Sequence, residues 1–183
     1  FGSFNNFDKI NPDVVSTWSK ILKKINNSKL VLKTSTKRFA TKRLKQLFEK
    51  NDVLDSVKFI NKVPEFKKHL ENYNHIDIAL DTFPFNGVTT SFEAIWMGVP
   101  VLTMAGYNFN SRCGESINKN LGMEQLIAKN EDDYVQKVFN LTNNYQDYIN
   151  LRKSIFCDAI KSPLFNKKKF AENFFNSLKE IVK

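Results

Sequence analysis

Cysteine and histidine are scarce in this chain of 183 residues, which contains two of each. Cys113 and Cys157 are too few for a disulfide framework, so we expect both to be reduced thiols. With only His69 and His75 as further nitrogen ligands, the sequence predicts no zinc site and no metal cofactor. The shortage of these residues excludes small domains that depend on disulfides or zinc for stability.

Long apolar runs are also missing from the sequence. No run approaches the ~20 residues that a membrane-spanning helix needs, so we expect no membrane partner. The first residues lack a basic segment followed by an apolar one, which predicts no signal peptide and a cytoplasmic location. The chain begins without methionine, in a strand-like segment, and we expect it to be part of a longer protein.

The net charge of +9 raises the question of a nucleic-acid partner. The lysines are scattered along the chain and interleaved with Asp and Glu, and they do not gather on one groove-reading element. We therefore expect no nucleic-acid partner, and a basic nucleic-acid-binding domain is kept as an alternative. A basic domain also suits a small anionic ligand.

Apolar runs alternate with amphipathic segments along the whole chain. This alternation is typical of parallel strands joined by helices, so the sequence predicts an α/β fold, a Rossmann-like doubly wound parallel sheet, in a single domain over residues 1–183. The predicted strands are 1–5, 29–34, 57–63, 76–82, 99–104 and a short one at 125–128. The predicted helices are 11–24, 36–50, 64–74, one between 82 and 99, 112–121, 131–140, 145–160 and 167–183.

The segment "DTFPFNGVTTSFEAIWMGVPVLTM", residues 81–104, contains the predicted ligand site. A doubly wound sheet binds ligands at the carboxyl ends of its strands, where the strand order reverses, and this segment starts at such an end. Thr90 and Glu93 have the spacing of a helix capping box, which is a sufficient structural explanation. The same helix start also suits a phosphate group, because free backbone N–H groups attract anions and Thr89 and Thr90 add hydroxyl donors. Standard dinucleotide and triphosphate fingerprints are absent from the sequence.

Several segments together closely resemble one known family, the O-linked N-acetylglucosamine transferases and their SPINDLY-type relatives. They are "IDIALDTFPFNGVTTSFEAIWMGVPVLTM", "FGSFNNFDKINPDVVSTWSKIL" at the start, "GYNFNSRCGES", "IAKNEDDYV" and "SPLFNKKKF". The resemblance covers essentially the whole chain, but only the carboxyl-terminal half of that family's catalytic region. It implies the nucleotide-sugar lobe of a two-lobed GT-B fold, with the other lobe absent from this chain.

The resemblance also implies an activity and its partners. The expected reaction is an inverting, metal-independent transfer of N-acetylglucosamine from a UDP-sugar to Ser or Thr hydroxyls of proteins. The acceptor protein would be bound through the missing lobe and a preceding array of TPR helical repeats. We therefore expect this chain alone to transfer no sugar.

The family pattern assigns a role to individual residues. It makes Lys9 the catalytic residue, as the cation beside the diphosphate that leaves the donor sugar. It places Asn6, Thr89 and Thr90 at the diphosphate and Glu93 at the ribose. It packs His69 on the nucleobase, although by sequence alone His69 reads as an exposed residue on a helix face.

This sequence also departs from the family pattern. Asn6 stands where a glutamine is usual, Val88 replaces a histidine, and Phe66 and Asn72 replace basic residues near the base. The identity of the base and sugar therefore stays open, and donors such as GDP-fucose or a UDP-hexose are alternatives. A non-catalytic nucleotide-binding or protein-interaction module is another. We assign a structural role to Arg112 and a core position to two further residues, Trp96 and Met97.

Overall fold

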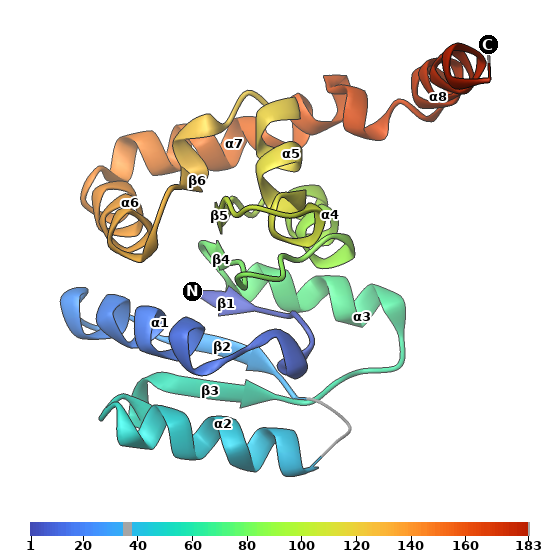
Figure 1. Cartoon of the computed structure of the whole chain (residues 1–183). Coiled ribbons are helices and arrows are strands. Elements are labelled where there is room, and N and C mark those ends of the chain that lie inside the picture. The colour runs from blue at the N-terminus through green and yellow to red at the C-terminus, as the bar shows by residue number, and fades with distance from the viewer. Residues whose placement is uncertain (35–37, 183) are drawn as a thin grey trace.

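The computed structural model describes residues 1–34 and 38–182 and contains a parallel sheet of six strands. The strand order is β3-β2-β1-β4-β5-β6, and every neighbouring pair is parallel (Figure 1). The strands are β1 (Gly2–Ser3), β2 (Leu30–Lys33), β3 (Val57–Ile60), β4 (Ala79–Leu80), β5 (Val101–Met104) and β6 (Ile127–Ala128). This order confirms the predicted Rossmann-like, doubly wound sheet.

Eight α-helices among the described residues connect and cover the strands. They are α1 (Pro12–Lys24), α2 (Arg38–Lys50), α3 (Phe66–Glu71), α4 (Thr89–Trp96), α5 (Cys113–Asn120), α6 (Glu131–Asn143), α7 (Tyr145–Lys161) and α8 (Lys167–Ile181). Each corresponds to a predicted helix. The predicted start of the second helix, at residue 36, and the predicted end of the last helix, at residue 183, lie outside the described residues.

The core lies between the sheet and these helices. Its largest fully buried side chains include Trp18 of α1, Phe48 of α2 and Tyr134 of α6. α1 packs against α6, so helices from distant parts of the sequence cover one region of the sheet. Figure 1 shows α2 beside β3 at one edge of the sheet and α6 and α7 near β6 at the other.

Two surface features complete the fold. The prediction that Trp96 lies in the core is wrong. Trp96 is 44% exposed, and its ring packs edge-on against the ring of Phe156. No residue of α8 is buried, and Figure 1 shows this helix beyond the end of α7. In the part of the chain that the structure describes, no helix combines the length and hydrophobicity that crossing a bilayer requires.

Candidate functional site

The candidate site lies where the strand order reverses, between β1 and β4. These two strands are neighbours, but the chain continues from β1 to β2 on one side and from β4 to β5 on the other. The segments that follow their carboxyl ends therefore meet at one edge of the sheet. The Lys9 Nζ atom, from the segment after β1, donates to the carbonyl oxygen of Asn86, from the loop after β4, at 2.7 Å.

Lys9 is held in place by contacts on both sides. Its ammonium lies 3.9 Å from the centre of the Phe85 ring, which is a cation–π contact. The 3-10 turn η1 (Phe7–Lys9) that carries it is fixed by Arg43, whose guanidinium donates to two carbonyl oxygens of this segment at 2.9 Å. Burial lowers the pKa of Lys9, and the nearby Asp81 carboxylate opposes that shift. The resemblance predicts Lys9 at the diphosphate of the donor, and the structure places Lys9 against the loop after β4.

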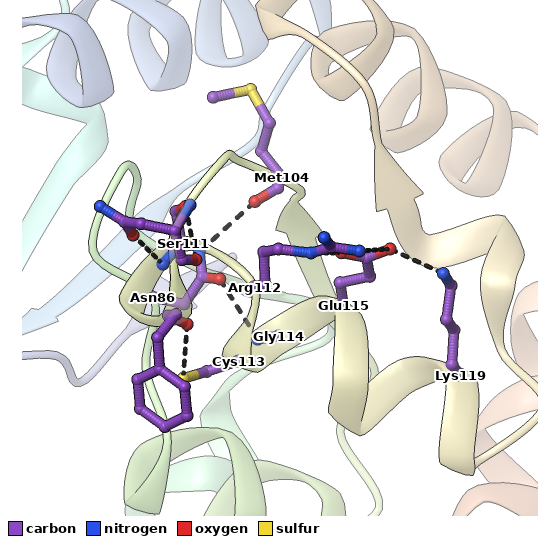
Figure 2. Close-up of polar contacts among 10 residues, drawn as sticks. Asn86, Met104, Ser111, Arg112, Cys113, Gly114, Glu115 and Lys119 are labelled. Carbon is purple, nitrogen blue, oxygen red and sulfur yellow. Dashed lines mark hydrogen bonds and ion pairs between the residues drawn. The ribbon is translucent and has the colours of Figure 1, made fainter.

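The Asn86 side chain joins the loop to the start of α5. Its amide nitrogen donates to the Thr82 carbonyl oxygen at 2.9 Å. The same nitrogen donates to the Met104 carbonyl oxygen at 3.5 Å, and the amide oxygen accepts from the Gly114 N–H at 3.2 Å (Figure 2). The side chain is fully buried. Because the same residue accepts from Lys9 through its carbonyl oxygen, Asn86 fixes the position of Lys9 relative to β5 and α5.

Arg112 contributes to the same region through a local network. Its guanidinium donates to the Glu115 carboxylate at 2.8 and 3.3 Å, and Lys119 donates to that carboxylate at 2.6 Å (Figure 2). These two cations lower the pKa of Glu115. The Arg112 side chain, directly before α5, thus pairs with the first turn of that helix, as a structural role requires.

The start of α4 differs from the predicted capping box. The residue before the helix is Val88, and it makes no side-chain capping hydrogen bond. The Thr90 hydroxyl donates instead to the Asn5 side-chain oxygen at 2.8 Å, and Glu93 bonds to other elements. The capping-box prediction is therefore wrong, because tertiary partners take both side chains. Within the described residues, the backbone N–H groups of Thr89 and Thr90 have no acceptor, so they remain available to an anion.

Gly87 is needed for the packing of this helix start. A Cβ atom at this position would lie 2.6 Å from the Thr90 hydroxyl oxygen and 2.8 Å from the Asn5 side-chain oxygen. A larger residue would therefore separate the two hydrogen-bonded partners.

His69 of α3 is in direct contact with Glu93, which lies one turn after the start of α4. The His69 Nε2 atom and the Tyr73 hydroxyl lie 2.9 and 3.0 Å from the same Glu93 oxygen, Oε2. The Lys33 ammonium lies 3.3 Å from His69 Nδ1. An ammonium can only donate, so Nδ1 accepts and Nε2 carries the proton that faces Glu93. The other carboxylate oxygen, Oε1, has no partner among the described residues and is free to accept from a ligand.

The surroundings of these groups correct one expectation. The His69 side chain is only 12% exposed, so the prediction of an exposed histidine from sequence alone is wrong. It is packed between Phe66 and Tyr73, with ring centres 6.3 and 5.9 Å from its own. Burial lowers the pKa of Lys33, and the Glu93 carboxylate opposes that shift. Burial, together with the same carboxylate, raises the pKa of Tyr73.

Asp81, at the end of β4, is a central residue of the site that the sequence reasoning missed. Its carboxylate is buried and accepts four hydrogen bonds, from the N–H groups of Gly87 and Thr82, the Thr103 hydroxyl and the Asn5 amide, at 2.6 to 3.2 Å. Burial raises the pKa of Asp81 to about 6, against the opposing effect of these donors. An acidic residue directly after an apolar strand was the available signal, since a buried charge at a strand end needs partners.

Asn6 is the predicted residue that the structure does not bring into this network. Its side chain is exposed and accepts from the Asp8 N–H at 3.2 Å, as the cap of η1. The neighbouring Asn5 is buried and connects Thr90 to Asp81. The other predicted residues, Lys9, His69, Thr89, Thr90 and Glu93, lie along the loop after β4, the start of α4 and the elements that touch them.

Besides a hollow along α8, two hollows lie away from the carboxyl ends of the strands. One, of about 670 Å³, is lined by α6 and α7 residues such as Asn140 and Leu151. The other, of about 430 Å³, includes Ser28 and Asp77, which precede β2 and β4 at the amino ends of the strands. Among the residues described, no group of three or more His, Cys, Asp or Glu side chains is arranged to hold a metal ion. Cys113 and Cys157 are both free.

Comparison with known proteins gives a consistent result. The chain matches Glycosyl transferase family 41 over residues 1–174. It is 36% identical to a protein from Solanum lycopersicum named probable UDP-N-acetylglucosamine–peptide N-acetylglucosaminyltransferase SPINDLY, over 94% of this chain and 19% of that protein. It is 35% identical to the Arabidopsis thaliana protein of the same name, over 100% of this chain and 20% of that protein. The chain thus spans about a fifth of the length of these relatives.

A solved structure shows the same fold. A variant of the Thermobaculum terrenum O-GlcNAc transferase superposes with a TM-score of 0.91 at 28% sequence identity. The match covers 98% of this chain and 35% of that one.

Proposed function

Because this chain belongs to glycosyl transferase family 41, we propose that it is the donor-binding lobe of a protein glycosyltransferase. Its relatives from Solanum lycopersicum and Arabidopsis thaliana, of which it spans about a fifth, are named probable peptide N-acetylglucosaminyltransferases. The proposed donor is UDP-N-acetylglucosamine, and the proposed acceptors are Ser and Thr hydroxyls of proteins, bound through parts of the protein other than this chain.

One observation carries this proposal. The Lys9 ammonium, 2.7 Å from the Asn86 carbonyl oxygen, contacts the loop after β4 that leads to the free N–H groups of Thr89 and Thr90. A cation and a helix start at the strand-order reversal form a site for a diphosphate. This fixed positive charge takes the place of a metal ion in the proposed mechanism.

The proposed chemistry assigns Lys9 its role. In an inverting transfer, the acceptor hydroxyl oxygen forms a bond to the anomeric carbon and gives up its proton to water, as the bond from that carbon to the diphosphate breaks. The electron pair of the broken bond leaves with the diphosphate, whose negative charge therefore increases. Lys9 would stabilise this developing charge, and the start of α4 would hold the same group in the bound donor.

Calorimetric titration of the chain with UDP, GDP and a single-stranded oligonucleotide tests the proposal against its alternatives. We expect saturable binding of UDP, weaker binding of GDP and no specific binding of the oligonucleotide. A preference for GDP would replace the donor. Binding of no nucleotide would favour a protein-interaction module, and salt-sensitive binding of the oligonucleotide alone would favour a nucleic-acid-binding domain.

The threonine pair provides a first mutational prediction. Thr89→Val together with Thr90→Val should weaken UDP binding by about 1–3 kcal/mol, the scale of losing hydrogen bonds to a charged group. Thr142→Val, on α6, is a matched control, because that hydroxyl bonds only to carbonyl oxygens of its own helix. Unchanged UDP affinity in a folded double variant would rule out the threonine contacts.

Glu93 provides a second prediction. In Glu93→Gln the amide oxygen can still accept from His69 and Tyr73, while the amide nitrogen replaces the free oxygen Oε1. We expect the melting temperature to stay nearly constant and the affinity for UDP to fall by about 1–3 kcal/mol, because a ribose hydroxyl loses its charged acceptor. Parallel melting and calorimetry decide the matter, and an unchanged affinity would reject the ribose role.

A further inference from the structure

The buried carboxylate of Asp81 contacts residues that form the proposed diphosphate site. It accepts from the Gly87 N–H at 2.6 Å and, at 3.2 Å, from the Asn5 amide, which in turn accepts from the Thr90 hydroxyl. It also accepts from the Thr103 hydroxyl of β5 at 2.8 Å. One acidic group thus connects the end of β1, the loop after β4, the start of α4 and the neighbouring strand.

We propose that Asp81 is a positioning residue of the donor site, whose ionised carboxylate holds the start of α4 and the Thr90 hydroxyl in the arrangement that binds a nucleoside diphosphate. This inference rests on the proposed function of the same site. Only an acceptor of several hydrogen bonds can hold two N–H groups, a hydroxyl and an amide at once, and an ionised carboxylate accepts more strongly than a neutral group.

The ionised form of Asp81 lowers the stability of the fold. This distinguishes a residue that positions the site from one that only stabilises the fold. Burial raises the pKa of Asp81 from its ordinary 3.8 to about 6. Between these values the folded chain binds more protons than the unfolded chain, so the contribution of Asp81 to stability rises as pH falls through this window. Its ionised state at neutral pH therefore lowers stability while it orders the site, a combination that recurs at functional sites.

The charged and titratable groups around Asp81 come from two other elements. The Lys9 ammonium of η1 attracts the carboxylate, and the buried hydroxyl of Tyr134 from α6 donates to the backbone oxygen of Asp81 at 2.9 Å. Burial and the Asp81 charge together raise the pKa of Tyr134 well above its ordinary value, so this hydroxyl stays neutral throughout the window. Burial lowers the pKa of Lys9, and the Asp81 carboxylate opposes that shift.

The test compares Asp81→Asn with the unaltered chain by UDP calorimetry from about pH 5 to 7.5 and by thermal melting. Asn is nearly the same size and can keep the bonds to one oxygen. We expect Asp81→Asn to melt at the same or a higher temperature at pH 7.5 and to bind UDP about tenfold more weakly. A residue with a purely supporting role would lower the melting temperature and the affinity together.

The pH profile gives a second readout. In the unaltered chain the affinity should fall as pH decreases through about 6, where Asp81 becomes neutral. The terminal phosphate of UDP also titrates at about pH 6, and this lowers the affinity of both proteins alike. The further decrease that comes from Asp81 should be present in the unaltered chain and absent from Asp81→Asn. Asp132→Asn, an exposed acidic residue in the first turn of α6, is the matched control and should follow the unaltered chain.

A second variant keeps the inference falsifiable if Asp81→Asn does not fold. Thr103→Val removes one donor to the carboxylate, so the loss of UDP affinity should begin at a higher pH than in the unaltered chain. Equal affinity of Asp81→Asn and the unaltered chain at every pH, or an unmoved profile in Thr103→Val, would overturn the inference alone. Failure of the unaltered chain to bind UDP or GDP would overturn the proposed function, and this inference with it.

Discussion

Replacement of Lys9 by alanine should lower the turnover number by at least about 100-fold, the usual range for deleting one electrostatic stabiliser. The measurement needs the longest polypeptide that carries this sequence, because the chain spans only a fifth of its curated relatives. If Lys9 stabilises the leaving diphosphate, its effect is larger in the transition state than in the bound donor. The Michaelis constant for the donor should therefore change less than turnover.

Two further variants sharpen this prediction. Lys9→Arg should restore little activity, since a planar guanidinium cannot both donate to the Asn86 carbonyl oxygen in the same way and occupy the place of the ammonium over the Phe85 ring. Lys153→Ala, at an exposed position on α7, controls for the loss of one positive charge and should leave turnover unchanged. Wild-type turnover in Lys9→Ala would remove the catalytic role and leave Lys9 as a structural cation of the loop.

Gly114→Ala should both destabilise the fold and abolish UDP binding. A Cβ atom at Gly114 would overlap the Thr103 hydroxyl and lie 2.7 Å from the Thr103 Cβ and 2.9 Å from the Asp81 carboxylate. Thr103 is fully buried in β5, so α5 has to move, and overpacking of this kind lowers the free energy of unfolding by about 1–3 kcal/mol. The movement also breaks the bond from the Gly114 N–H to Asn86, which positions Lys9.

Thermal melting and UDP calorimetry on Gly114→Ala check this prediction together. Ser116→Ala is the control, because it adds no bulk and lies on the exposed side of the same helix. Normal melting and normal UDP affinity in Gly114→Ala would show that the packing of α5 against β5 does not shape the site.

The order of strands and helices could be predicted because each buried strand is an apolar run and each helix has one apolar face. The site was predicted in part, and the reason differs between residues. Lys9 and the helix start at Thr89 follow from a resemblance and from a local pattern. The partners of Thr90 and Glu93 do not, because Asn5 and Tyr73 reach them from 85 and 20 residues away in sequence.

The misassigned residues show the same limit. Asn5 and Asn6 are neighbours, but only the first is buried, since successive side chains after a strand point to opposite sides. The Thr90–Glu93 spacing fits a capping box, and tertiary hydrogen bonds take both groups instead. Asp81 was overlooked because a local pattern does not reveal how many donors converge on one carboxylate.

The most direct test of the central claim is a heteronuclear NMR titration of this chain with UDP, which reports the position of the ligand. The account predicts that the largest amide shift changes fall on the loop after β4, on Thr89 and Thr90, and on the segment that carries Lys9. Shift changes confined to the hollow that includes Ser28 and Asp77 would contradict it. That hollow lies at the amino ends of the strands, opposite the carboxyl ends where the proposed site lies.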